Sequence, residues 1–243
     1  MASLKSFAAL SFDCYGTLVD WEGGIIAALQ PLTKRLDPTH PLKTDGAALL
    51  QKYGAHESRI QKQYTTLKYS AILERVYGEI ASELGLDASV TDDEKVAFGA
   101  SIGHWPAFPD TITALKQLSR HFKLIILSNV DKESFARTLS GPLAGIPFDA
   151  IYVAEEIGSY KPDPRNFEYL MEHCESDLQV PRDKLLHTAY ALFHDLTPAK
   201  RAGLKTCWIE RKPNVMGGEP SQLDSDISLD FRFPTLGDMA REL

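Results

Sequence analysis

The chain has 243 residues, 44% of them hydrophobic, which is enough for one large core or for a core that carries a smaller inserted domain. Its formal net charge is −7 and its 26 lysines and arginines are scattered, so we expect no nucleic-acid partner. No apolar run approaches the length of a membrane span, so we expect no membrane partner. Three cysteines without paired or metal-ligand spacing favour a reducing compartment and predict a cytoplasmic location.

The first predicted element is a buried strand within residues 4–12. This short apolar segment ends abruptly at Asp13, and a glycine-containing stretch typical of a turn follows it. Asp13 is therefore expected at the carboxyl end of the strand.

Residues 22 to about 103 are predicted to form an all-helical insert. Apolar side chains recur there at helical spacing, as in the series Ile25, Leu29, Leu32 and Leu36. The insert has the length of a small domain. We therefore predict two domains, a core made of residues 1–20 and 104–243 and a helical domain made of residues 21–103.

After the insert, apolar segments of strand length alternate with helical patterns. Asp110 is a candidate N-cap of the helix that follows it, and Asp163 opens a later helix. The predicted strands cover residues 124–127, 150–154, 185–188, 206–209 and, at the edge, 230–233. Residues 211–225 are predicted to be a loop. Alternating strands and helices predict a doubly wound, Rossmann-like α/β fold with a parallel sheet.

In such a sheet, ligands bind beyond the carboxyl ends of the strands. The predicted strand ends carry Asp13 and Thr17, Ser128 and Asn129, Lys161, and Asp195. Two carboxylates, an ammonium group and a hydroxyl-amide pair are thus expected to form one compact polar site.

Four short motifs resemble those of the haloacid dehalogenase superfamily, and in particular its 2-haloacid dehalogenases. Residues 12–18 (FDCYGTL) are similar to the first motif, in the form with a Tyr two residues after the nucleophile. Residues 127–129, 160–163 and 194–203 resemble the second, third and fourth motifs, in the right order. The resemblance implies a hydrolase whose helical insert is the cap domain, and relatives of this kind are often homodimers.

The resemblance also implies a role for each site residue. Asp13 is expected to be a nucleophile that forms a covalent ester, and Lys161 to neutralise part of the charge of Asp13 and of a small anionic substrate. Asp195 is expected to activate the water that opens the ester. The residues expected to contact the substrate are Tyr15, Thr17, Ser128 and Asn129.

A cysteine and two histidines near the predicted site residues are interpreted as structural. Cys14 is a rival nucleophile by chemistry, but side chains alternate along a strand, so it should point away from Asp13 and pack in the core. His187 and His194 are expected to be structural, because no second His or Cys stands at a metal-ligand spacing from either.

The site departs from its relatives at several positions. Phosphatases of the superfamily carry a second Asp two residues after the nucleophile and an acidic metal ligand five residues before the fourth-motif Asp, where this chain has Tyr15 and Tyr190. Losing a carboxylate weakens a Mg²⁺ site, so we expect no metal and no other cofactor. In 2-haloacid dehalogenases, polar residues stand at the positions of Phe167, Tyr190 and Leu192.

Three functional hypotheses follow. The first is a metal-independent hydrolase similar to (S)-2-haloacid dehalogenases. The second is an atypical phosphatase in which Asp13, Asp195 and the Tyr15 carbonyl hold Mg²⁺. The third is a catalytically silent member that binds a ligand, because a fold alone does not fix a function.

Overall fold

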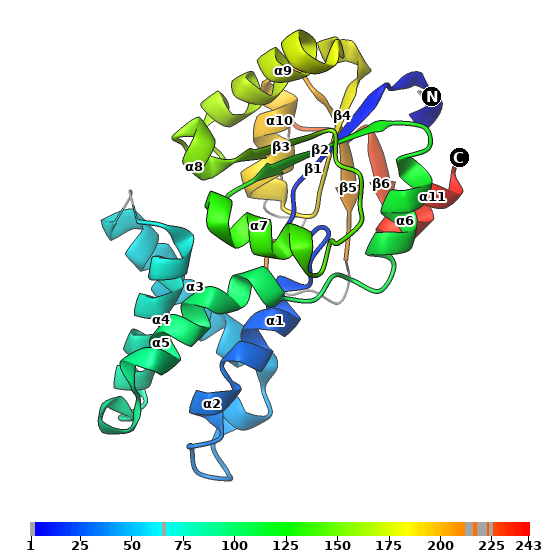
Figure 1. Cartoon of the computed structure of the whole chain (residues 1–243). Coiled ribbons are helices and arrows are strands. Elements are labelled where there is room, and N and C mark those ends of the chain that lie inside the picture. The colour runs from blue at the N-terminus through cyan, green and yellow to red at the C-terminus, as the bar shows by residue number, and fades with distance from the viewer. Residues whose placement is uncertain (1–2, 65–66, 212–215, 218–222, 224–225) are drawn as a thin grey trace. The chain divides into compact units, whose positions relative to one another are not determined.

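The structure, a computed structural model, describes residues 3–64, 67–211, 216–217, 223 and 226–243. The chain forms two compact units, which are described separately (Figure 1). The core unit contains Met1–Asp20, Ala107–Lys132 and Leu143–Leu243, and the helical unit contains Trp21–Pro106 and Glu133–Pro142.

The segment Glu133–Pro142 was predicted in the core domain, whereas the structure groups it with the helical unit. A close approach at Gly103 explains the difference. A Cβ atom placed at Gly103 would lie 2.5 Å from the Cβ of Arg137, so the two backbones meet where glycine leaves room.

The core unit is built on one parallel sheet. Within the described residues, six strands pair in the order β3-β2-β1-β4-β5-β6, and every pairing is parallel. The strands are β1 (Ala9–Phe12), β2 (Lys123–Ser128), β3 (Ala150–Val153), β4 (Leu185–Ala189), β5 (Lys205–Ile209) and β6 (Phe231–Phe233). The strand order reverses between β1 and β4, where α/β sheets bind their ligands. The predicted doubly wound, Rossmann-like α/β fold is confirmed.

The first strand is shorter than predicted. Leu4–Ser6 form a 3₁₀ turn, in which the Ser3 hydroxyl accepts a hydrogen bond from the backbone N–H of Lys5. Strand pairing begins only at Ala9. Leu4 is nevertheless buried, and an apolar pattern alone does not distinguish a strand from a turn that packs on the core.

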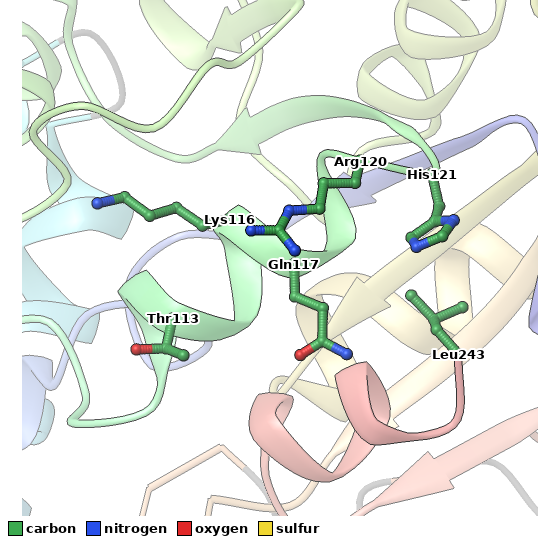
Figure 2. A pocket seen from close by; sticks show the side chains of 6 residues that line it. All are labelled: Thr113, Lys116, Gln117, Arg120, His121 and Leu243. Carbon is green, nitrogen blue, oxygen red and sulfur yellow. The ribbon is translucent and has the colours of Figure 1, made fainter.

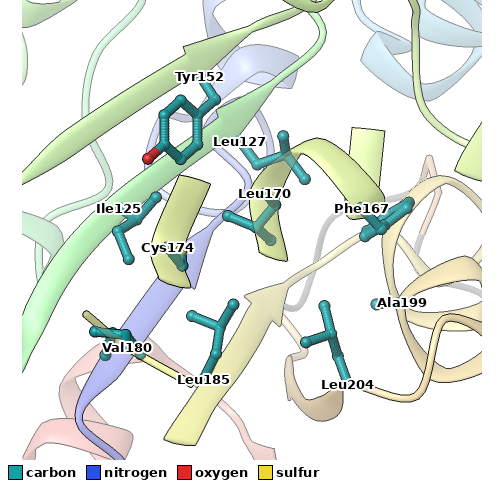
Figure 3. Close-up of a cluster of buried hydrophobic side chains, with 11 residues drawn as sticks. Ile125, Leu127, Tyr152, Phe167, Leu170, Cys174, Val180, Leu185, Ala199 and Leu204 are labelled. Atoms are coloured by element: carbon teal, nitrogen blue, oxygen red, sulfur yellow. The ribbon is translucent and has the colours of Figure 1, made fainter. Parts of the chain in front are cut away.

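Helices cover both faces of the sheet in Figure 1, with α8 (Ala154–Ile157), α9 (Pro164–Leu178) and α10 (Thr197–Arg201) on one side. On the other side lie α6 (Thr111–Leu118) and α11 (Leu236–Arg241). The first residue of α7 (Lys132–Ser140) belongs to the core unit and the rest of this helix to the helical unit. Figure 3 shows how α9 joins the sheet through one buried apolar cluster. Its members include Phe167, Leu170 and Cys174 of α9 and Ile125, Leu127 and Leu185 of the strands.

Asp110 precedes α6, as predicted, but its side chain does not cap the helix. Its Oδ1 accepts a hydrogen bond from Nη1 of Arg211 at 2.5 Å, and its Oδ2 accepts one from the backbone N–H of Gly237 at 2.8 Å. Asp163 does cap its helix, because its carboxylate accepts a hydrogen bond from the N–H of Arg165 at 3.0 Å. Asp110 therefore ties α6 to two distant segments.

The described part of the helical unit contains only helices and turns. Besides most of α7, its α-helices are α1 (Trp21–Ala28), α2 (Gln30–Thr33), α3 (Gly46–Gln63), α4 (Tyr69–Glu83) and α5 (Asp92–Ala100). The apolar series predicted from Ile25 to Leu36 is buried, but a break at Leu29 divides its helix. Pro31 explains the break, since proline lacks the N–H that a continuous helix needs and suits the first turn of a new one.

Most of the predicted loop at 211–225 lies outside the described residues, at positions 212–215, 218–222 and 224–225. Among the helices that the structure describes, none is both long and apolar enough to cross a membrane.

Candidate active site

Asp13 follows β1 directly and is held between its neighbouring strands. Its backbone N–H donates to the carbonyl of Thr188 on β4 at 3.1 Å, and its side chain is almost fully buried. The chain then turns at Gly16, whose φ of 95° lies in the region that glycine adopts without steric cost. The turn returns Thr17 to the Asp13 carboxylate.

Thr17 was predicted to donate a hydrogen bond to the substrate, but its hydroxyl is already used. Oγ1 donates to Oδ2 of Asp13 at 2.8 Å and accepts from the backbone N–H of Tyr190 at 2.9 Å. The side chain is fully buried, and a hydroxyl has a single proton to give. Thr17 therefore orients the Asp13 carboxylate instead of contacting a substrate.

Lys161 joins the two carboxylates of the site. Its Nζ donates to Oδ1 of Asp13 at 2.8 Å, to Oδ1 of Asp195 at 2.6 Å and to the carbonyl of Leu127 at 2.9 Å. The ammonium group is 1% exposed and makes the three hydrogen bonds that it can donate. The structure thus brings the three predicted catalytic side chains together, with Lys161 in direct contact with both Asp13 and Asp195.

The second motif lies at the end of β2. Asn129 makes a reciprocal pair with the backbone of Lys161, in which Nδ2 donates to the carbonyl at 2.9 Å and Oδ1 accepts from the N–H at 2.7 Å. Asn129 therefore positions the loop that carries the ammonium group. Within the described residues, the buried hydroxyl of Ser128 has no hydrogen-bond partner, so it can still bind a ligand. Tyr15 lies half-buried on the turn, bridged to Val19.

Asp195 lies on a π-helical turn, Leu192–Leu196, and one of its neighbours was not predicted as a site residue. Nε2 of His187 lies 3.1 Å from Oδ1 of Asp195, and Nδ1 of the same ring lies 2.9 Å from Oγ of Ser11. Ser11 and His187 are fully buried. The available sequence signal was a polar residue, Ser11 or His187, inside each of two mainly apolar strands.

The two carboxyl groups respond differently to the same burial. Burial raises the pKa of Asp13, and the charge of Asp195 adds to this rise, which Lys161 and Thr17 only partly offset. Burial also favours a higher pKa for Asp195, but the opposing effects of Lys161 and His187 are larger, so the pKa of that carboxyl is lowered. Desolvation opposes the charge of Lys161, yet the two carboxylates raise its pKa and keep it an ammonium group.

Cys14 is fully buried, as predicted. Burial, with the nearby Asp13 charge, raises the pKa of its thiol well above the usual range. Because only a thiolate is a strong nucleophile, Cys14 is chemically inert in this position.

A surface hollow of the core unit lies away from these residues. It measures about 450 Å³ and, as Figure 2 shows, is lined by Thr113, Lys116, Gln117, Arg120, His121 and Leu243. Most of these residues belong to α6 and the turn that leads into β2, so they lie toward the amino end of that strand. None of the candidate catalytic residues lines it.

A family model described as haloacid dehalogenase-like hydrolase matches residues 7–187, which include Asp13 and Lys161. The chain belongs to this family. It is accordingly a hydrolase, and the resemblance found in the four sequence motifs is confirmed.

Individual relatives of this haloacid dehalogenase-like hydrolase agree with the assignment. The (S)-2-haloacid dehalogenase of Pseudomonas sp. (strain YL) is 26% identical over 223 residues, which cover 87% of each chain. The crystal structure of the L-2-haloacid dehalogenase PA0810 is 26% identical, with a TM-score of 0.76 over 97% of this chain and 98% of that chain. The L-2-haloacid dehalogenase of Xanthobacter autotrophicus shares the fold, with a TM-score of 0.75 at 19% identity over 97% of each chain.

This haloacid dehalogenase-like hydrolase uses three divergent positions for packing. Phe167 belongs to the apolar cluster under α9, and its ring stands edge-on to the ring of His187 with centroids 5.6 Å apart. Leu192 packs with Trp208 in a second cluster, and Tyr190 is buried with its backbone N–H on Thr17. The side chains at these three positions are therefore buried and are not part of the polar site.

Proposed function

We propose that this hydrolase is a metal-independent dehalogenase that acts on a small 2-haloacid anion, in the manner of (S)-2-haloacid dehalogenases. The observation that supports this most directly is the ammonium group of Lys161, held between Asp13 at 2.8 Å and Asp195 at 2.6 Å. The 26% identity with an (S)-2-haloacid dehalogenase, over 87% of both chains, favours this substrate class.

In the first step, a carboxylate oxygen of Asp13 attacks C2 of the substrate. A bond forms between this oxygen and C2, the carbon–halogen bond breaks, and the halide leaves with the bonding electrons. Lys161 and Thr17 fix the attacking carboxylate through one hydrogen bond to each oxygen. The buried positive charge of Lys161 also favours an anionic substrate.

In the second step, water opens the ester. Asp195 accepts a proton from the water and the hydroxide adds to the carbonyl carbon of the ester. The bond between this carbon and the ester oxygen on C2 of the substrate then breaks, the 2-hydroxy acid leaves with the proton held by Asp195, and Asp13 returns to a carboxylate by losing a proton to solvent. Since Oδ1 of Asp195 holds Lys161 and His187, and Oδ2 has no hydrogen bond within the described residues, Oδ2 is the oxygen that can bind this water. The whole reaction converts haloacid and water into hydroxy acid, halide and a proton.

The site does not fit the magnesium-dependent alternative. Mg²⁺ needs several oxygen ligands in near-octahedral geometry, but the cation that Asp13 and Asp195 share is the ammonium group of Lys161. Among the residues that the structure describes, no three His, Cys, Asp or Glu side chains cluster as a metal site.

The experiment that tests the proposal is halide release from L- and D-2-haloacids, with a chelator present throughout. Wild type and Asp13→Asn should be compared, because asparagine keeps the size of the side chain and removes its charge. We expect halide from wild type with the L-acids only, and a mass increase on Asp13 when the reaction is quenched within one turnover.

Absence of halide with every 2-haloacid would refute the proposed substrate class. Phosphate release that requires added Mg²⁺ would favour the phosphatase instead. The three cysteines, free and buried, also lead us to propose a reducing, cytoplasmic location.

A further inference from the structure

The site contains a buried histidine that neither attacks the substrate nor accepts a proton in the two proposed steps. His187 lies in the middle of β4 and is fully buried. Buried polar groups need hydrogen-bond partners, and both ring nitrogens have one, since Nδ1 lies 2.9 Å from Ser11 Oγ and Nε2 lies 3.1 Å from Asp195 Oδ1. The ring therefore connects the sheet to the fourth motif.

The chemistry of the partners determines which nitrogen carries the proton. An ionised carboxylate can only accept a hydrogen bond, so Nε2 must be protonated to interact with Asp195. In a neutral ring, Nδ1 is then the acceptor, and the Ser11 hydroxyl donates to it. Ser11 thus selects the tautomer that Asp195 requires, as the partner of one ring nitrogen commonly does for the other.

The hydrogen bond from His187 constrains how Asp195 presents its second oxygen. Oδ1 of Asp195 receives two donors, from Lys161 and from His187, which define the plane of the carboxylate. Phe167 packs edge-on against the imidazole ring and limits its rotation. With Oδ1 occupied from two directions, only Oδ2 can approach a water molecule.

We propose that His187, held in its Nε2–H tautomer by Ser11, is a positioning residue that fixes the Asp195 carboxylate for attack by water on the ester. This inference rests on the proposed function, because it assigns His187 to the second step and not to the first. Loss of the hydrogen bond should therefore slow ester hydrolysis and leave ester formation nearly unchanged.

The first test is independent of turnover. In ¹⁵N-labelled protein, the ring of His187 should show a proton on Nε2, assigned by its disappearance in His187→Gln. A bare Nε2 would overturn the inference. In ¹³C-labelled protein, Asp195 should titrate at higher pH in His187→Leu than in wild type, because one donor to the charged form is lost. An unchanged titration would also overturn it.

The second test separates the two chemical steps. A hydrogen bond to a charged group is worth about 10- to 100-fold in rate, so His187→Leu should slow ester hydrolysis by about that factor. The ester on Asp13 should then accumulate during steady state, as measured by mass spectrometry. His187→Gln should restore most of the rate, because its amide can donate from near the position of Nε2.

Leu186→Val is the matched control and should hydrolyse the ester at the wild-type rate, since it changes a buried side chain on the opposite side of the same strand. If His187→Leu fails to fold, the same measurements can be made on Ser11→Ala, which removes the hydroxyl that selects the His187 tautomer. Hydrolysis at the wild-type rate in both His187 variants would overturn the inference. If wild type releases no halide, the proposed function fails, whereas the two NMR measurements still decide whether His187 positions Asp195.

Discussion

A single ammonium group serves two carboxylates in this site. Lys161 gives one hydrogen bond to Asp13, one to Asp195 and one to the carbonyl of Leu127, all in a buried environment. The trio of charged side chains therefore carries a net negative charge away from solvent. Such an arrangement is costly unless every partner stays in place.

Replacing Lys161 with methionine should reveal this cost. Removing one partner of a buried ion pair typically destabilises a protein by about 3–5 kcal/mol, and here two carboxylates lose their cation. In Lys161→Met the folded-state pKa of these carboxyls rises above the unfolded value, so the destabilisation should be largest at neutral pH and shrink as pH falls toward 5. Urea denaturation at several pH values measures it, and an equal loss at every pH would contradict the explanation.

The Thr17 hydroxyl contributes to keeping the nucleophile ionised. Burial already raises the pKa of Asp13, and the Thr17 hydroxyl opposes that rise by donating to the charged form. In Thr17→Val the pKa should rise further, so the acid limb of ester formation should move to higher pH. Thr17→Ser keeps the donor and should retain the wild-type profile. A shift to lower pH in the valine variant would show that another group causes the limb.

The sequence was sufficient to predict three charged residues that lie together in the candidate site, but it did not predict the histidine bound to one of them. Asp13, Lys161 and Asp195 could be found because each follows a strand inside a motif with its own spacing. His187 was missed because its partner Ser11 is its register neighbour across β1 and β4, and register between distant strands cannot be read from one sequence. The donor role predicted for Thr17 failed for a similar reason, since nothing in the sequence shows that its proton goes to Asp13.

At the scale of the elements, the alternation of strands and helices could be predicted, but the hydrogen bonds made by the residues that precede the helices could not. Every predicted strand is present, although the first begins only at Ala9 and the edge strand is a short, partly exposed segment. Asp110 and Asp163 both precede a helix, and both were predicted to start one. Only the structure shows that Asp163 caps α9, whereas Asp110 binds Arg211 and the backbone of Gly237.

Because Asp110 and Asp163 make different interactions, replacing each with alanine should lower the free energy of unfolding by a different amount. Asp110→Ala leaves the buried guanidinium of Arg211 without its carboxylate, which should cost about 2–3 kcal/mol. Asp163→Ala removes an exposed N-cap and should cost about 1 kcal/mol. Chemical denaturation of both variants and wild type measures the two values. A larger loss in Asp163→Ala than in Asp110→Ala would show that Asp110 acts as an ordinary cap.

At the scale of the molecule, the core unit contains three cysteines in three different parts of the fold. Cys14 follows β1, Cys174 lies in α9 and Cys207 lies in β5, and all three are free and buried. Burial raises the pKa of Cys174 to about 12 and places those of Cys14 and Cys207 well above the usual range. None of them should therefore react while the core unit is folded.

Thiol labelling with a disulfide reagent tests this expectation. We expect no labelling of the native protein within minutes and three labels per chain in denaturant. The labelling rate should follow unfolding measured by circular dichroism as denaturant increases. Rapid labelling of one cysteine in protein that still has its native spectrum would show that part of the core unit opens independently.

Trp208 gives the core unit an internal fluorescent reporter of its own site. Its indole Nε1 donates to the carbonyl of Tyr190 at 3.0 Å, and the N–H of that same residue donates to the Thr17 hydroxyl that holds Asp13. The other two tryptophans, Trp21 and Trp105, belong to the helical unit and can be replaced by phenylalanine. Emission from the remaining indole would then follow, in real time, each change in charge at the nucleophile three hydrogen bonds away.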